Sequence, residues 1–230
     1  MSKPLEESKI DSIAESIIKL AKRPIFQYRK NNKPFIMTEK NYICIIGNIC
    51  LMLRKDQQKF QEVFDYVKEH NCENINLIIN SPGGSVKDKD RVLEYINKSP
   101  VPIDCIIIGK CASAAIEIAL ECRNISIYYK SKVGIHYPIN IEYDEDRKEV
   151  LKETNDQNQI KYYKEYFSRK FNISEEEANT LLKESKYLNV DQAIKYNFIT
   201  NIFYELPEIY LRFKNTLMSK IEYQHISKKI

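Results

Sequence analysis

Short apolar runs alternate along the chain with segments whose apolar residues recur at helical spacing, and this alternation predicts both strands and helices. Strands are predicted at residues 42–47, 74–79, 102–108, 125–129, 133–137 and 196–200. Helices are predicted at residues 8–22, 55–70, 86–97, 113–122 and 146–170, and two shorter ones begin at capping boxes, Ser174 with Glu177 and Asn189 with Gln192. Strands that alternate with helices favour right-handed βαβ units and a mostly parallel sheet.

The length and the apolar content favour one folded domain. A chain of 230 residues, 43% of them hydrophobic, suffices for one good-sized core. We expect an N-terminal helix and variable segment at residues 1–40, a folded domain at 41–202 and a tail at 203–230. The tail alternates apolar and basic residues, which is typical of a docked helix or of a segment that faces a partner.

Charge and cysteine usage narrow the class of protein. The 36 basic and 32 acidic residues give a net charge of +4, which is no signature of nucleic-acid binding. The six cysteines form no Cys-x-x-Cys pair, so we interpret them as reduced core thiols, without zinc or disulfides. No apolar run reaches the length of a membrane span, and residues 5–8 are too acidic for a signal sequence. We therefore expect a cytoplasmic location, or a plastid-type organelle or mitochondrial matrix after removal of a targeting segment.

Candidate chemistry is concentrated at the ends of three predicted strands. The turn Asn80–Gly84 follows one strand, Ser113 stands between another strand and a helix, and His136 closes a third. The chain has only five glycines, and all lie in or beside such motifs, where backbone must turn or approach a ligand closely. Because the carboxyl ends of parallel strands meet at one edge, these residues should converge. A serine beside a histidine indicates a nucleophile and its base, hence a serine hydrolase.

Taken one at a time, these residues have ordinary structural interpretations. Ser113 could be a helix N-cap, His136 a strand-end histidine, and the Asn80–Gly84 segment a simple turn. It is their order and spacing together that carry the functional interpretation.

Together the motifs resemble those of the ClpP family, the proteolytic subunit of the ATP-dependent Clp protease. The family's Asn-Ser-Pro-Gly-Gly turn, Gly-x-Ala-Ala-Ser nucleophile turn and Ile-His-x-Pro base are matched by residues 80–84, 109–113 and 135–138, and the likeness covers roughly residues 41–202. The resemblance implies a ClpP/crotonase-like α/β fold, a βαβ spiral with a mostly parallel sheet and a protruding long-helix handle. It also implies Ser113 as nucleophile, His136 as base, and the amides of Gly84 and Ala114 as the oxyanion hole.

One departure concerns the third member of the triad. Gap-free counting places the family's catalytic Asp at Ser185, and a serine cannot supply the negative charge that stabilises an imidazolium. In chymotrypsin-type proteases, neutralising that Asp lowers kcat by about 10⁴-fold. Glu184 and Asp191 are alternative carboxylates, and the sequence does not decide between them.

Other departures surround the expected site. Ala115 replaces a glycine, Glu117 replaces a large hydrophobe, residues 85–90 replace a segment of small residues, and the acidic run 142–146 replaces a Gly-rich hairpin that binds substrate. These charges could alternatively face solvent. The Lys183-Glu184 pair inverts the family's Asp-Arg order, which suggests assembly with a matched partner subunit.

Three functions remain open at this stage. The first is a Clp-type serine endopeptidase that acts on unfolded proteins or peptides, forms rings with itself or related subunits, needs no cofactor of its own, and depends for ATP on a partner Hsp100 unfoldase. The second is a divergent, ClpR-like ring subunit with impaired catalysis, which the serine at position 185 favours. The third is a crotonase-type acyl-CoA enzyme, although nothing in the sequence suggests adenine-nucleotide binding.

Overall fold

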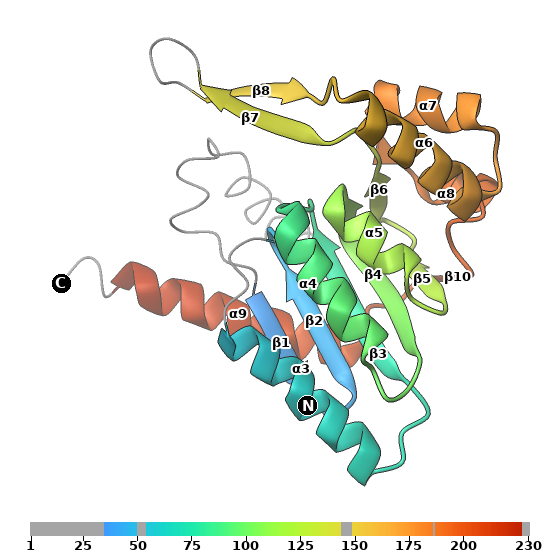
Figure 1. Cartoon of the computed structure of the whole chain (residues 1–230). Coiled ribbons are helices and arrows are strands. Elements are labelled where there is room, and N and C mark those ends of the chain that lie inside the picture. Colours follow the sequence, from blue (N-terminus) through green and yellow to red (C-terminus); the bar gives the residue numbers. More distant parts are fainter. Residues whose placement is uncertain (1–34, 50–53, 144–148, 186, 227–230) are drawn as a thin grey trace.

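The computed structural model describes residues 35–49, 54–143, 149–185 and 187–226, which form a layered α/β domain (Figure 1). The predicted helix at 8–22 and Cys50 lie outside these residues. No helix among the described residues is both long enough and apolar enough to cross a bilayer.

The strands, in chain order, are β1 Phe35–Glu39, β2 Tyr42–Ile46, β3 Ile75–Ser81, β4 Ile103–Ala112, β5 Ile125–Tyr128, β6 Lys132–Gly134, β7 Ile139–Tyr143, β8 Glu149–Glu153, β9 Tyr187–Leu188 and β10 Asn201–Phe203. The helices are α3 Arg54–Glu69, α4 Val86–Asn97, α5 Ala114–Leu120, α6 Gln157–Phe171, α7 Glu175–Glu184, α8 Val190–Lys195 and α9 Glu208–Ile226.

Within the described residues, eight strands form one sheet in the order β1-β2-β3-β4-β5-β10, with β6 beside the end of β4 and β9 beside β6. The central pairs β2–β3, β3–β4, β4–β5 and β4–β6 are parallel, and β1 and β9 add antiparallel pairs. Because β3 and β6 both run parallel to β4, all three strands end at the same edge of the sheet. Helices α4 and α5 follow β3 and β4 there. The predicted α/β class and mostly parallel sheet are confirmed.

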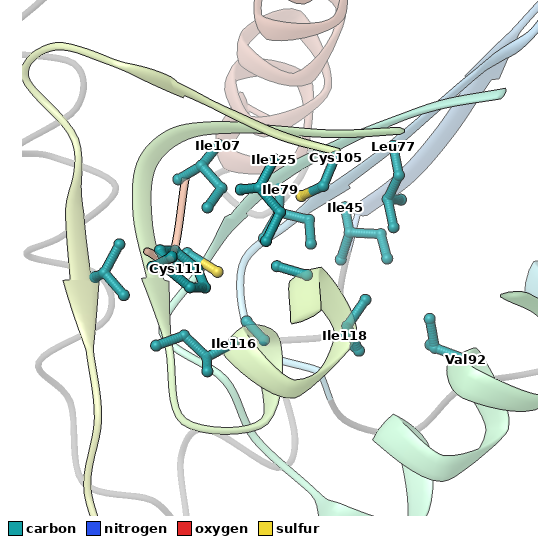
Figure 2. Packing of buried hydrophobic residues seen from close by; sticks show 14 of the residues in the cluster. Ile45, Leu77, Ile79, Val92, Cys105, Ile107, Cys111, Ile116, Ile118 and Ile125 are labelled. Carbon is teal, nitrogen blue, oxygen red and sulfur yellow. The ribbon is translucent and has the colours of Figure 1, made fainter. Parts of the chain in front are cut away.

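The middle parts of the central strands are apolar on both faces, as expected where helices cover both faces of the sheet. Alternate residues such as Ile45, Ile79 and Ile107 face α3, α4 and α5 in the main core (Figure 2). The residues between them, including Ile78 and Ile108, face α9 in a second cluster. Helix α9 contributes Ile209, Tyr210, Phe213 and Leu217, so this part of the predicted tail is a docked helix.

The β7–β8 hairpin and helices α6 and α7 extend beyond the edge of the sheet at which β6 ends (Figure 1). The predicted helix at 146–170 is wrong over residues 149–156, because residues 149–153 form β8 and pair with β7; the handle helix α6 begins only after the N-cap Asp156. The predicted strand at 196–200 is also wrong: those residues form a turn after α8, and β10 begins at Asn201. Buried tyrosines of α6 join it to α5, where Tyr166 donates a hydrogen bond to Glu121 over 3.0 Å.

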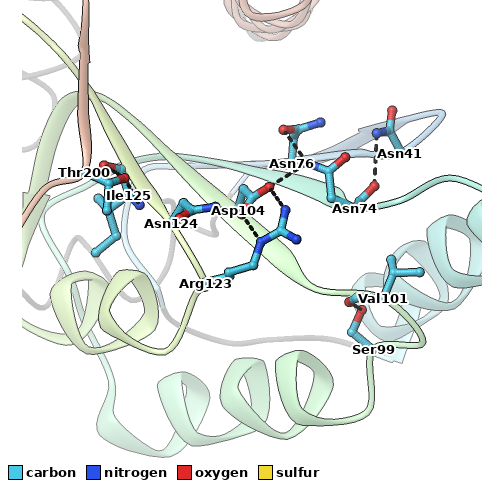
Figure 3. A network of polar contacts seen from close by, with 10 residues as sticks. All are labelled: Asn41, Asn74, Asn76, Ser99, Val101, Asp104, Arg123, Asn124, Ile125 and Thr200. Atoms are coloured by element: carbon cyan, nitrogen blue, oxygen red, sulfur yellow. Dashed lines mark hydrogen bonds and ion pairs between the residues drawn. The ribbon is translucent and has the colours of Figure 1, made fainter.

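A polar network closes the opposite edge of the sheet (Figure 3). Asp104 accepts hydrogen bonds from Arg123, from Asn74 over 2.7 Å and from Asn124 over 2.9 Å. The guanidinium of Arg123, ahead of the amide donors, lowers the pKa of Asp104. The network ties the starts of β3, β4 and β5 together.

Candidate active site

Ser113 lies between the end of β4 and the start of α5 in a strained backbone conformation. Its φ of 54° and ψ of −129° lie in a region that non-glycine residues rarely adopt. The side chain makes no capping hydrogen bond to α5, so the interpretation of Ser113 as a plain N-cap is wrong. A partly exposed serine on a sharp strand-to-helix turn is the geometry of a nucleophile elbow.

The glycine turn after β3 lies directly against Ser113. A Cβ atom on Gly83 would come within 2.6 Å of the Ser113 Cβ, so only glycine fits there. The Gly83 amide donates to the Ser81 hydroxyl over 3.0 Å, which fixes the turn from within. Asn80 accepts a hydrogen bond from the Lys110 amide over 3.2 Å and thereby joins this turn to the end of β4.

The sequence predicts that two backbone amides of this region, those of Gly84 and Ala114, bind an oxyanion. Ala114 is the first residue of α5, and the first amides of a helix have no acceptor within it. Gly84 lies in a short parallel bridge with Ile49, next to Gly83 and therefore close to Ser113. The turn and the helix start that carry these two predicted donors are held in place by other contacts.

His136 follows β6 on the side of Ser113 away from the glycine turn. The Ser113 amide donates to the Gly134 carbonyl over 2.9 Å, which locks the nucleophile turn to β6 two residues before His136. The histidine lies just beyond the strand, since β6 ends at Gly134 and not at residue 137 as predicted.

The His136 imidazole is hydrogen-bonded to the backbone of the next residue. Its Nδ1 lies 2.5 Å from the Tyr137 carbonyl oxygen. A carbonyl oxygen only accepts hydrogen bonds, so this contact requires a proton on Nδ1 and leaves the Nε2 lone pair free. That is the tautomer a general base needs.

The third triad position contains no carboxylate. Ser185 ends α7 with left-handed backbone angles, and its hydroxyl donates to the Leu182 carbonyl over 3.4 Å or to Glu153 Oε1 over 3.3 Å. Of the alternative carboxylates, Glu184 is the exposed last residue of α7 and Asp191 lies on the exposed first turn of α8. For Asp191, no contact with His136 is found among the described residues.

A buried ion pair joins α4 to α5, the helix that follows Ser113. Lys89 of α4 and Glu117 of α5 are joined over 2.8 Å, and the Tyr163 hydroxyl donates to the second oxygen of Glu117 over 3.3 Å. Burial raises the pKa of Glu117. Burial alone would lower the pKa of Lys89, but the hydrogen bond and charge of Glu117 raise it above its ordinary value. The interpretation of these two charges as solvent-facing is therefore wrong.

Two surface hollows, of about 430 and 370 Å³, lie at the edge of the sheet opposite Ser113, one near Pro102 and Arg123 and the other near Asp104 and Phe203. Within the described ranges, no group of three or more His, Cys, Asp or Glu side chains is arranged to hold a metal ion. The described cysteines are free thiols, and burial raises the pKa of Cys44 and Cys111, which keeps them unreactive.

Sequence reasoning missed two features of the site. Glu153 falls in the interior of the predicted polar helix, because residues 149–153 have no apolar alternation that would indicate a strand. The pairing of Lys89 with Glu117 was missed as well, although both charges break the apolar stripes of their helices.

Comparisons with known proteins agree with this architecture. The profile of the Clp protease family matches residues 37–205, and the chain belongs to that family. No curated protein matches the sequence.

Solved structures share the fold at low sequence identity. A mutant of the 1510-N membrane-bound stomatin-specific protease is 21% identical, with a TM-score of 0.57 over 75% of this chain and 84% of that one. Another mutant of it, in complex with a substrate peptide, is 20% identical, with a TM-score of 0.57 over 72% and 75%. ClpP1 from Listeria monocytogenes is 17% identical, with a TM-score of 0.55 over 72% and 92%. The chain therefore shares its fold with these proteases.

Proposed function

We propose that the chain is a serine endopeptidase subunit of the Clp type, which cleaves unfolded proteins or peptides through an acyl-enzyme on Ser113. The observation that carries the proposal is the strained turn at Ser113, whose hydroxyl is not used as a helix cap. Strain of this kind costs of order 1–3 kcal/mol and persists only where the surrounding structure imposes it. Here β6 and the glycine turn impose it from both sides.

In the proposed mechanism, the Ser113 hydroxyl oxygen attacks the scissile carbonyl carbon while His136 Nε2 accepts the hydroxyl proton. The amides of Gly84 and Ala114 donate hydrogen bonds to the resulting oxyanion. Collapse of the tetrahedral intermediate breaks the C–N bond, and the imidazolium returns its proton to the leaving amine. Water then attacks the ester, with His136 again as base, and releases the second product.

Membership of the Clp protease family supports ring assembly with copies of this chain or with related subunits, and delivery of substrate by an ATP-dependent Hsp100 unfoldase. Lys183 and Glu184 are both exposed at the end of α7. A Lys183→Glu/Glu184→Lys exchange should then change which subunits co-assemble. A homo-oligomer of the usual double-ring size, unaltered by the exchange, would contradict the matched-partner hypothesis.

A second candidate function is a ring subunit with impaired catalysis. The serine at position 185 favours it, because a serine cannot supply the negative charge that stabilises an imidazolium. Such a subunit would contribute walls and interfaces to a ring whose other members cleave substrate.

Fluorophosphonate labelling of the assembled protein decides between the two. The active-subunit proposal expects one adduct, mapped by mass spectrometry to Ser113, absent in Ser113→Ala and retained in a Ser126→Ala control. No adduct on the assembled wild-type protein would overturn that proposal in favour of the impaired subunit.

A further inference from the structure

A carboxylate lies beside the position that the triad leaves without one. Glu153, the last residue of β8, accepts a hydrogen bond from Ser185 over 3.3 Å. The two residues are 32 positions apart, so the contact depends on the fold of the β7–β8 hairpin over the end of α7.

Strand register brings both residues to the segment that contains His136. In the antiparallel pairing of β6 with β9, Gly134, two residues before His136, is opposite Tyr187, two residues after Ser185. In the hairpin, Ile139 is opposite Glu153, and the Thr154 amide donates to the Pro138 carbonyl over 2.9 Å. The segment between Gly134 and Ile139, which contains His136, is therefore close in the fold to both Ser185 and Glu153.

The negative charge of Glu153 affects the pKa of a residue in that segment. Burial, followed by the negative charge of Glu153, raises the pKa of Tyr137, the residue next to His136. The Tyr137 hydroxyl donates to Asn179 of α7 over 2.8 Å, which holds this tyrosine between the hairpin and α7.

We propose that Glu153 supplies the negative charge that stabilises the His136 imidazolium, and that Ser185 holds the Glu153 carboxylate in place. The triad's two usual duties are then divided between two groups. The Tyr137 carbonyl sets the tautomer of the imidazole, and Glu153 provides the charge. Glu153 is in these terms a positioning residue that acts through His136. The inference rests on the proposed function of Ser113 and His136.

The expected effect is smaller than for a buried triad Asp. Glu153 is exposed, and water and salt weaken the interaction of exposed charges. We therefore expect Glu153→Gln to lower the rate of Ser113 labelling and the kcat for a peptide about tenfold, with KM nearly unchanged, against the roughly 10⁴-fold loss for a chymotrypsin-type Asp.

The substitution separates charge from structure. A Gln side chain keeps the shape of Glu153 and an oxygen that accepts the Ser185 hydrogen bond, so a purely structural role predicts no change. Ser185→Asp in the Glu153→Gln background returns a carboxylate to the same place and should restore most of the rate. Glu165→Gln, which removes an exposed carboxylate paired with Lys161 on α6, is the matched control and should leave the rate unchanged.

Each outcome is decisive. Wild-type labelling of Ser113 that is unaffected by Glu153→Gln, or a loss that Ser185→Asp does not restore, would overturn the role of Glu153 and leave the proposed function standing. No labelling of Ser113 in the wild-type protein or in any variant would overturn the proposed function, and the role of Glu153 with it.

Discussion

The backbone of Gly84 lies directly against that of Ile49. The Ile49 amide donates to the Gly83 carbonyl over 2.8 Å, and the Ser85 amide donates to the Ile49 carbonyl over 2.7 Å. A Cβ atom on Gly84 would lie within 2.8 Å of the Ile49 carbonyl carbon, and its φ of 151° is one that side chains rarely adopt. Gly84→Ala should therefore shift the Gly84 amide and lower the rate of Ser113 labelling by about 10²–10³-fold, the usual loss for one oxyanion donor.

Gly47→Ala is the matched control for that prediction. Gly47 also has a positive φ, of 89°, but no atom lies within 4 Å of its missing Cβ. The substitution should cost about 1 kcal/mol of stability through backbone strain and leave labelling intact. Equal labelling rates in the two variants would contradict an oxyanion role for the Gly84 amide.

Removing one charge of the Lys89–Glu117 pair should lower the free energy of unfolding, whereas replacing both residues by apolar ones should change it little. Glu117→Gln removes one charge of a pair in which both side chains are only 7% exposed, although Asp90 remains 3.0 Å from Lys89. We expect the free energy of unfolding to fall by about 3 kcal/mol, because the buried Lys89 then has only Asp90, which is largely exposed, to compensate its charge. Lys89→Met/Glu117→Leu should return it to within about 1 kcal/mol of wild type. Urea unfolding at one fixed protein concentration measures both changes, and a stable single variant would show that the pair is not buried in solution.

Much of the fold could be predicted because local signals and burial agree. Helix α4 was predicted to its end residues, since Ser85 caps it and accepts a hydrogen bond from the Asp88 amide while its apolar stripe faces the core. The Asn189–Gln192 capping box of α8 was likewise confirmed. At Ser174, the cap bond to the Glu177 amide was found.

The errors arose where long-range pairing decides the structure. Residues 149–153 pair with 139–143 across the hairpin, and no local pattern reveals that partner. The same pairing places Glu153 at the site, so counting along the chain could find Ser185 but not its neighbour. Ser113, Gly83 and the strand leading to His136 converge as expected because β3, β4 and β6 end at one edge.

Acid should weaken the network around Asp104. Its pKa is lowered from an ordinary value near 3.8, chiefly by the Arg123 hydrogen bond, so the carboxylate stabilises the fold above that pH. This contribution is lost as the pH falls through the lowered folded-state pKa. Asp104→Asn should therefore be less stable than wild type at pH 7, and the difference should shrink as the pH falls below about 3.8. A difference that is the same at pH 7 and pH 3 in urea unfolding would show that the charge contributes nothing.

Helix α9 should act as part of the folded domain. Phe213 is 6% exposed and lies with Ile78 and Ile108 in the second apolar cluster, on the sheet face away from α4 and α5. The Asn80 side-chain amide also donates to the Tyr210 hydroxyl over 3.1 Å, so α9 contacts the residue that opens the glycine turn. Phe213→Ala should lower the free energy of unfolding by about 3–5 kcal/mol, because it removes a large side chain from a closed core.

The exposed Asn215 on the same helix provides the comparison, since Asn215→Ala should change stability by no more than about 0.5 kcal/mol. Both variants should be compared with wild type in thermal and urea unfolding at the same protein concentration, because assembly also stabilises the subunit. If Phe213→Ala is as stable as the Asn215→Ala control, α9 does not pack against the sheet in solution. The second cluster would then be open to another occupant. If Phe213→Ala alone is destabilised and also labels Ser113 more slowly, the contact between Tyr210 and Asn80 carries the order of α9 into the glycine turn.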